Sequence, residues 1–145
     1  MPFTVEITNH PSGDQLPLLI DQDGQPIPWP NEFILGRRYL AANTLVRNLR
    51  EIAIFWRWLE REQINLAEVV SGARRLGEAQ ISTSLIDFLR RDQNTAKKVR
   101  KISIVPGSFN KRLITIRQFI DWCFDVEIGL STNVGPDYER LHCVI

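Results

Sequence analysis

The chain has 145 residues, of which 43% are hydrophobic, 24% charged and 9% aromatic. This length suits one domain with a sizeable core and is too short for two ordinary domains. Its 18 basic and 17 acidic residues give a formal net charge of +1, which excludes a highly charged disordered chain and a uniformly basic, histone-like protein.

The first 36 residues are predicted to form an N-terminal arm, either extended or folded as a short β-hairpin. Apolar and polar residues alternate over 3–8, a second apolar run covers 16–20, and Asp23-Gly24 is a turn signal. Three prolines then predict a stiff connector without regular helix over residues 25–30: Pro26, Pro28 and Pro30. Trp29, inside this connector, is expected to anchor the arm on an apolar surface.

A first long helix is predicted from Asn43 to about Glu62. Apolar residues recur there at spacings of four, three, four and three, which is typical of one buried helix face; they are Leu45, Leu49, Ile52, Trp56 and Leu59. Asn43 or Thr44 is expected to cap its start.

The opposite side of this helix carries Ile54 and Trp58 beside three arginines, because residues at 100° intervals place them together. The arginines are Arg47, Arg50 and Arg61. Two apolar patches indicate a helix covered on both sides. The N-terminal arm packing over Trp58 is the simpler cover, and a partner subunit is the alternative.

Two further helices are predicted before the last third of the chain. A short one within residues 64–77 ends near Gly72, and a longer one runs from about Glu78 to Arg91. The longer helix is expected to turn four apolar side chains inward: Ile81, Leu85, Phe88 and Leu89. Arg90 and Arg91 fall at its C-terminal end, where the helix dipole favours cations.

Residues 92–101 are polar and basic and predict a loop, followed by a third long helix. Pro106-Gly107 is a turn signal, and Ser108 is a suitable N-cap for a helix from about Phe109 to Val126 that Gly129 ends. Its predicted inner stripe is Leu113, Ile116, Ile120 and Phe124, flanked by Phe119 and Cys123. Residues 131–145 are expected to form a linker with a short helix near 137–141.

The positive charge is concentrated late in the chain. Residues 1–36 contain five acids and no Lys or Arg, residues 90–117 contain nine basic residues and one acid, and residues 118–145 contain one basic residue and five acids. A local excess of this kind indicates a polyanion partner, and DNA above all. The alternative is a solvated run of charge that serves solubility.

The placement of this excess relative to the third helix favours DNA. Lys111 and Arg112 are predicted in the first turn of that helix, where cations oppose the helix dipole unless an external anion neutralises them. Ser108 and Asn110 add uncharged donors beside them. Four more basic residues precede the helix: Lys97, Lys98, Arg100 and Lys101.

Patterns of catalytic chemistry are absent from the sequence. It contains no glycine-rich phosphate loop, GxSxG elbow, HExxH or CxxC motif. His10 and His142 lie too far apart along the chain to favour a metal or catalytic site, so neither metal nor cofactor is expected. Cys123 and Cys143 are expected as reduced thiols rather than a disulfide, since no run long enough to cross a membrane and no export signal is seen and a cytoplasmic location is predicted.

In their order and spacing, four segments resemble the N-terminal core-binding domain of tyrosine recombinases, the phage integrase family. These segments are residues 43–45 with 55–59, residues 87–89 and residues 108–122, and the similarity covers about residues 40–130. The resemblance implies an all-α, SAM-like bundle of four to five helices over residues 37–130, with the arm outside it. Residues 131–145 would lead toward a catalytic domain.

The resemblance also implies a role in DNA recombination. In that family the starts of two helices point to the major groove while the catalytic domain grips the other face of the duplex. Carried over, Asn43, Thr44 and Arg47 on the first helix and Ser108, Asn110, Lys111 and Arg112 on the third would contact DNA, with Lys97, Lys98, Arg100 and Lys101 as phosphate contacts.

The catalytic constellation of the family has no counterpart here. The only tyrosines are Tyr39 and Tyr138, and neither has the partners of a nucleophile, so this chain alone is not expected to be an enzyme. Its expected partners are double-stranded DNA, the catalytic domain of a parent recombinase and other protomers on DNA. The alternative function is a helical protein-interaction module that mediates oligomerisation without reading bases.

Overall fold

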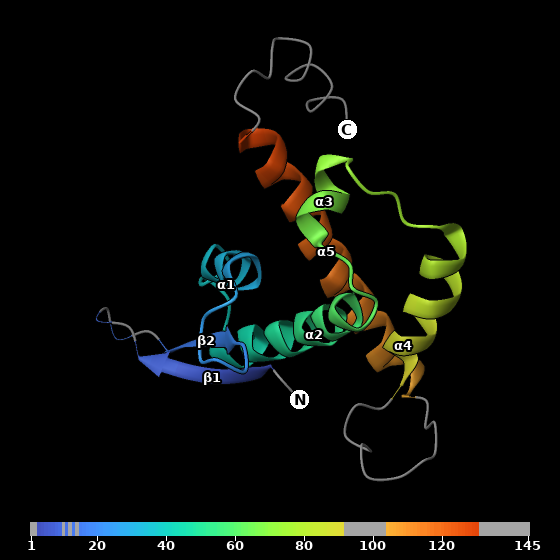
Figure 1. The fold of residues 1–145 in the computed structure, drawn as a ribbon. Helices are drawn as coiled ribbons and strands as arrows, with labels where there is room; N and C mark the ends of the chain where they lie inside the picture. Colours follow the sequence, from blue (N-terminus) through green and yellow to red (C-terminus); the bar gives the residue numbers. More distant parts are fainter. Residues whose placement is uncertain (1–2, 10, 12, 14, 92–103, 131–145) are drawn as a thin grey trace, which may run out of the picture.

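In the computed structural model, helices dominate and a small hairpin lies at one side (Figure 1). The structure describes residues 3–91 apart from 10, 12 and 14, and residues 104–130, the side chains of 128–130 excepted. This part contains five α-helices, one π-helical segment and one antiparallel sheet of two strands. A mostly helical fold with a hairpin arm is therefore confirmed. The predicted loop over 92–101 and the segment 131–145 lie outside the described residues.

The arm is a β-hairpin, which is one of the two predicted forms. Strand β1 (Thr4–Asn9) pairs with β2 (Gln15–Ile20), with Thr4 opposite Ile20 and Asn9 opposite Gln15. Leu19 is fully buried and Phe3 nearly so, because one face of the hairpin packs against the helices. The arm and the helices therefore share one hydrophobic core.

The predicted absence of helix over residues 25–30 is wrong, because α1 (Pro28–Leu35) begins inside this stretch. The N–H groups of a first helical turn have no partner within the helix, so Pro28 and Pro30 cost no hydrogen bond there. Asn31 fastens α1 to the sheet: its Oδ1 accepts from Leu19 N–H at 2.7 Å and its Nδ2 donates to Leu19 O at 2.9 Å. Trp29 packs against the core, as expected of an anchor.

Helix α2 (Ala42–Arg61) has the predicted inner stripe, of which only Trp56 is partly exposed. The predicted cap is wrong: Ala41 is the N-cap, without a side-chain hydrogen bond, and both Asn43 and Thr44 lie inside the helix. The hydrophobic cluster accounts for this start, since burial of Leu45 one turn later stabilises the helix without a cap.

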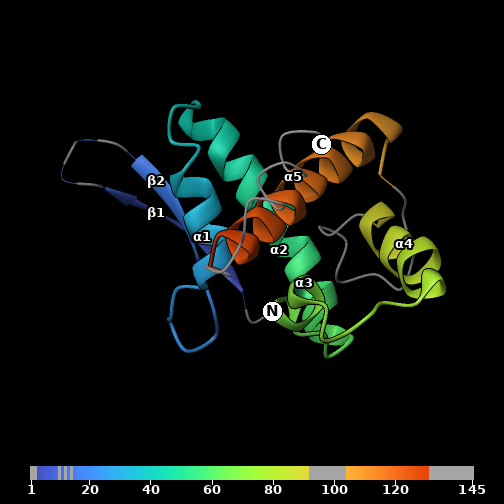
Figure 2. The ribbon, with the colours of Figure 1, turned by 90° about the horizontal axis from the view of Figure 1, so that it is seen from above.

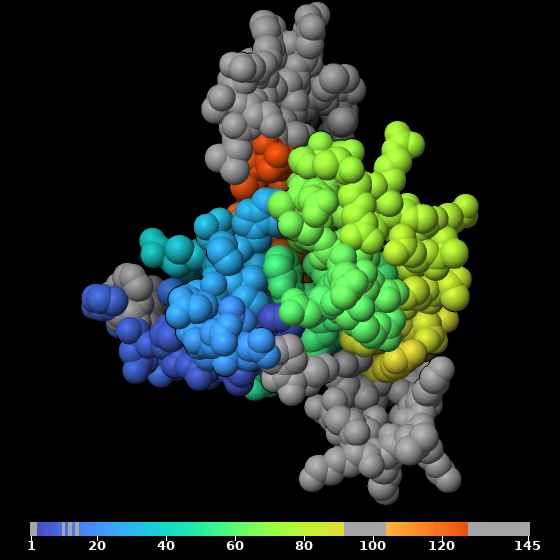
Figure 3. Space-filling view, viewed as in Figure 1, coloured from blue at the N-terminus to red at the C-terminus, as the bar shows by residue number. Residues whose placement is uncertain are grey.

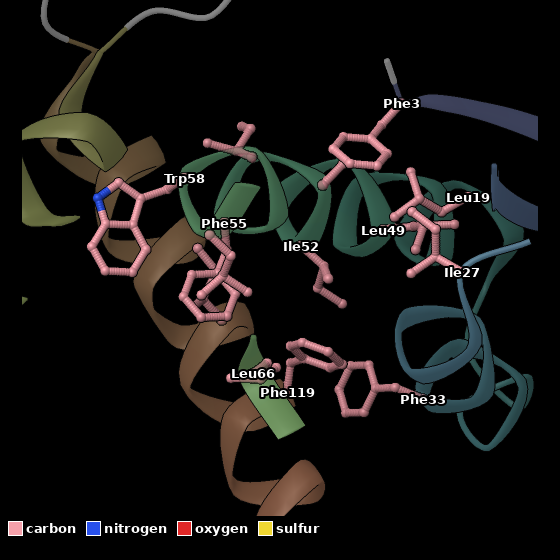
Figure 4. Close-up of a cluster of buried hydrophobic side chains, with 14 of the residues drawn as sticks. Phe3, Leu19, Ile27, Phe33, Leu49, Ile52, Phe55, Trp58, Leu66 and Phe119 are labelled. Atoms are coloured by element: carbon pink, nitrogen blue, oxygen red, sulfur yellow. The ribbon is translucent and has the colours of Figure 1, made fainter. Parts of the chain in front are cut away.

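Trp58 is buried by a different element from the one expected. Its Nε1 donates to Ser84 Oγ at 3.1 Å, and Ser84 Oγ donates to Glu62 Oε1 at 2.8 Å. Figure 4 shows Trp58 at one end of α2 and Phe3 farther along the helix, away from Trp58. The arm thus covers the α2 turns near Phe3, while the segment containing Ser84 covers Trp58, because the indole N–H needs a polar partner when buried.

Helix α3 (Leu66–Ser71) confirms the short predicted helix. Asn65 caps its start by accepting from Ala67 N–H at 3.0 Å, and Gly72 ends it with φ of 85°, a left-handed conformation that glycine adopts without strain.

The next helical stretch consists of the π-helical segment η1 (Gln80–Leu85) and α4 (Ile86–Arg90). Leu85, Phe88 and Leu89 are buried as predicted, but Ile81 is 44% exposed. Hydrogen bonds in a π-helix join residues i and i+5, so the stretch before Leu85 is rotated relative to a regular helix. Ile81 consequently turns away from the core.

Helix α5 (Pro106–Leu130) begins earlier than predicted and continues through Gly129. Ser108 is therefore the third residue of the helix and not its cap, and Pro106 occupies the first position, where proline is favoured. Ile116, Phe119 and Cys123 are buried, whereas Phe124, predicted on the inner stripe, is 38% exposed.

Three helices meet at Phe119, the centre of the core (Figure 4). Its ring centroid lies 5.5 Å from that of Phe33 on α1, 6.4 Å from that of Phe55 on α2 and 6.3 Å from that of Trp122 on α5. The rings of Phe33 and Phe55 meet that of Phe119 edge-on, whereas the Trp122 ring stacks on it, and both arrangements add to the burial of the rings. The position of α5 across α2 is thus set by Phe119 and its aromatic neighbours, and this crossing creates the site described next.

Candidate nucleic-acid interface

A groove of about 1130 Å³ lies between β1, one face of α2 and the start of α5. Its floor is a stripe of α2 residues spaced three or four apart, which one helix face presents together: Asn43, Arg47, Arg50, Ile54 and Arg57. Phe3 and Val5 of the arm form one wall, and Ser108, Lys111 and Arg112 of α5 belong to the other. We call this the basic groove.

The basic groove gathers five of the predicted DNA-contacting residues: Asn43, Arg47, Ser108, Lys111 and Arg112. Their approach follows from the crossing of α5 over α2, which Figure 2 shows. Thr44 and Asn110 do not line the groove. Lys97, Lys98, Arg100 and Lys101 lie outside the described residues.

Arg50 and Arg57 also line the groove, and the sequence reasoning did not select them as site residues. A signal was present, because Arg47, Arg50, Ile54 and Arg57 follow one another at spacings of three, four and three. Continuing the stripe beyond Arg47 finds both arginines.

The predicted position of Lys111 and Arg112 in the first helical turn is wrong. Helix α5 starts at Pro106, so Lys111 and Arg112 lie in its second turn instead of its first. The effect of the dipole falls off within the first turn. The positive charge of the groove therefore results from the side chains that α2 and α5 bring together and not from an unfavourable helix start.

Arg112 is engaged inside the protein. Its Nη1 donates to Leu89 O at 2.6 Å and to Arg91 O at 3.0 Å, and these carbonyls lie at the C-terminal end of α4, where acceptors lack helical partners. Arg91, expected to serve this helix end, instead pairs with Asp87 at 3.0 Å. Arg112 thus joins α5 to α4, and a DNA contact by Arg112 stays a prediction.

Lys111, by contrast, is exposed and has no hydrogen bond or ion pair with any residue that the structure describes. Arg50 is likewise exposed. Arg57 is half-buried, and its Nε has no hydrogen-bond partner within the described part of the chain. Burial lowers the pKa of the Arg57 guanidinium, although an arginine stays charged at neutral pH. These three cations are available to an anion in the groove.

Glu51 is the one carboxylate among the groove-lining residues. It is 8% exposed, accepts a hydrogen bond from Thr115 Oγ1 at 2.8 Å and lies 3.8 Å from Arg47 Nε. Burial raises the pKa of Glu51, while the bond from Thr115 and the charges of Arg47, Arg112 and Lys111 oppose that rise. Counted over the described residues, the groove therefore contains five basic side chains and one carboxylate, so their balance of charge is positive at neutral pH.

The raised pKa of Glu51 predicts a pH dependence of stability. Between the unfolded pKa and the higher folded pKa, the folded state binds more protons, so the free energy of unfolding decreases as pH rises through this window. Glu51→Gln removes this contribution, and the variant should gain stability relative to the wild type over the range from pH 4.5, the ordinary pKa of the carboxyl, upward. Urea unfolding of both proteins across this range measures the difference. Parallel profiles would contradict it, and Glu60→Gln, at an exposed position on the same helix, is the control.

The described residues give little support for metal binding, nucleophilic catalysis or membrane insertion. No group of three His, Cys, Asp or Glu there could hold a metal ion. Cys123 is fully buried in the core. Burial raises the pKa of its thiol to about 12, which makes it a poor nucleophile. Within the same residues, no helix is long and apolar enough to cross a membrane. His10, His142, Cys143 and Tyr138 lie outside them.

Comparisons of the chain with protein-family models, curated proteins and solved structures find no match. Functional inference consequently starts from the basic groove itself.

Proposed function

We propose that this chain binds duplex DNA through the basic groove, as the SAM-like core-binding domain of a site-specific tyrosine recombinase. It would hold one face of a recombination half-site, while the catalytic domain of the parent protein closes on the other face and neighbouring protomers assemble on the DNA. In this role the chain positions DNA and does not cut it.

The observation that carries the proposal is the row of cations on α2 facing those on α5. Arg47 and Arg57 are ten residues apart, so the row extends about 15 Å along the helix. A nucleic-acid backbone presents phosphates at regular intervals over such a length. Asn43 and Ser108, at the starts of the two helices, add uncharged donors that suit phosphate oxygens or base edges.

The availability of these cations supports an external anion. Arg112 is held by backbone carbonyls, and Glu51 neutralises at most one cation, so Arg47, Arg50, Arg57 and Lys111 together keep a positive charge for a ligand. Binding several phosphates releases counterions, so affinity should depend steeply on salt.

Titration of the chain with a short duplex at several salt concentrations tests the proposal. If four to six phosphates are neutralised, log K against log[salt] should have a slope of about −4 to −5. Lys111→Ala should flatten it by about 0.9, because one phosphate contact is lost. Arg112→Ala should change the slope by less and instead lower the free energy of unfolding by about 1.5–3 kcal/mol, because the α4 carbonyls lose a charged donor.

The two variants are matched controls for each other, since each removes one positive charge from adjacent positions of α5. A salt slope near zero for the wild type would refute DNA binding. Equal slope changes with unchanged stability would refute the separate roles of Lys111 and Arg112.

A further inference from the structure

A second concavity, of about 350 Å³, lies between α1, the C-terminal half of α2 and the start of α3. Its lining includes Pro28 and Trp29 from α1 and Trp56, Leu59 and Glu60 from α2. Figure 3 shows a hollow between the light-blue surface of α1 and the green surface of α3. We call it the indole pocket. It is separate from the basic groove, because Trp56 and Glu60 point to a different side of α2 from Arg50 and Arg57.

The walls of the indole pocket are aromatic and apolar. Trp29 and Trp56 are both partly exposed, and neither indole N–H has a hydrogen-bond partner within the described residues. A tryptophan face is the best aromatic surface for a cation, because its π electrons attract positive charge. Two such side chains in one concavity favour a ligand that combines positive charge with apolar surface.

Among the residues that the structure describes, Glu60 is the only charged one that lines this pocket. Its side chain is exposed and forms no ion pair or hydrogen bond within the part of the chain that the structure describes. An anion would be repelled, and a neutral apolar group would cover the carboxylate without pairing it. An arginine side chain suits both the Glu60 carboxylate and the tryptophan faces, since its guanidinium pairs with a carboxylate and stacks on indoles while its aliphatic stem covers apolar surface.

The segment around the indole pocket is negatively charged, like Glu60 within it. Residues 1–36, which include α1, contain five acids and no Lys or Arg. Glu32 lies one turn after Pro28 on α1 and is exposed. This acidic segment attracts a basic partner and repels DNA, so the pocket is not an extension of the basic groove.

We propose that the indole pocket binds an arginine side chain presented by a basic segment of a partner protein. The guanidinium pairs with Glu60, and its stem lies against Trp29 and Trp56. The site is independent of DNA binding and gives the chain a second interaction surface, of opposite charge preference to the first.

The experiment uses the peptide acetyl-Gly-Gly-Arg-Gly-Gly-amide and the same peptide with citrulline in place of arginine. Titration of the 15N-labelled chain should shift the indole N–H signals of Trp29 and Trp56, with half-saturation in the millimolar range that a single side chain supports. The Trp58 indole, buried and bonded to Ser84, should not shift. Trp29→Phe assigns the Trp29 signal by its loss.

Glu60→Gln should weaken arginine-peptide binding about threefold or more, because the ion pair is lost. Glu68→Gln, an exposed carboxylate on α3 that does not line the pocket, changes the net charge equally and should leave binding unchanged. Equal shifts with the citrulline peptide, equal effects of the two variants, or no indole shift would each overturn the proposal. None of these results involves DNA, so they leave the proposed function of the basic groove intact.

Discussion

Replacing Arg47, Arg50 and Lys111 together with glutamine should reduce duplex affinity by about 10²- to 10³-fold at 0.1 M salt. Each side chain lines the basic groove and is exposed, so the fold should survive. Three lost phosphate contacts at about 0.9 each should also flatten the slope of log K against log[salt] by about 2.7. Fluorescence anisotropy of a labelled duplex at three or more salt concentrations measures both quantities.

A matched triple variant distinguishes the effect of the groove cations on DNA binding from the effect of net charge. Arg38, Arg75 and Arg117 are exposed and lie outside the groove, so their replacement by glutamine changes the net charge by the same three units. We expect its slope to stay within about 1 of the wild-type slope, since screening limits the influence of distant charges. Equal losses in the two triple variants would show that DNA binding does not use the groove.

The largest expected effect on stability is that of Phe119→Ala. Phe119 is fully buried and contacts aromatic rings from α1, α2 and α5. Removing this ring should lower the free energy of unfolding by about 3–5 kcal/mol, because transfer energy is lost and a cavity remains. This is a large share of the total stability of a domain, and urea unfolding followed by circular dichroism measures it.

Phe124→Ala on the same helix is the control. The Phe124 side chain is 38% exposed, so its truncation should cost about 1 kcal/mol or less. This pair also tests the orientation of α5, because the periodicity alone placed Phe124 on the inner stripe and Phe119 beside it. Similar losses for the two variants would contradict the observed orientation.

Local patterns in the sequence predicted much of the fold. The inner stripe of α2, the hairpin alternation and the Gly72 end of α3 are all confirmed. Each depends on interactions between residues a few positions apart, which periodicity and turn preferences describe well. The helix that begins at Pro28 was not predicted, because proline breaks the interior of a helix but is accepted in its first turn.

Part of the candidate site could also be predicted from the sequence. The excess of basic residues late in the chain pointed to α5, and Asn43, Arg47, Ser108 and Lys111, which the resemblance proposes as DNA contacts, line one groove. The roles of Arg112 and Trp58 were not predictable, because their partners lie 21 to 26 positions away along the chain. A side chain pointing into solvent and one reaching a distant carbonyl have the same local sequence signal.

The amino-acid order on its own determined a mostly helical chain with a hairpin arm, its main apolar faces and the uneven distribution of charge, since these follow from short-range backbone preferences and from counting. Only the tertiary structure decided which cations remain available. The crossing of α5 over α2 at Phe119 brings Lys111 to the arginines of α2, and the same crossing places Arg112 against the end of α4. Two adjacent basic residues thereby acquire different roles, because helix geometry turns neighbouring side chains about 100° apart.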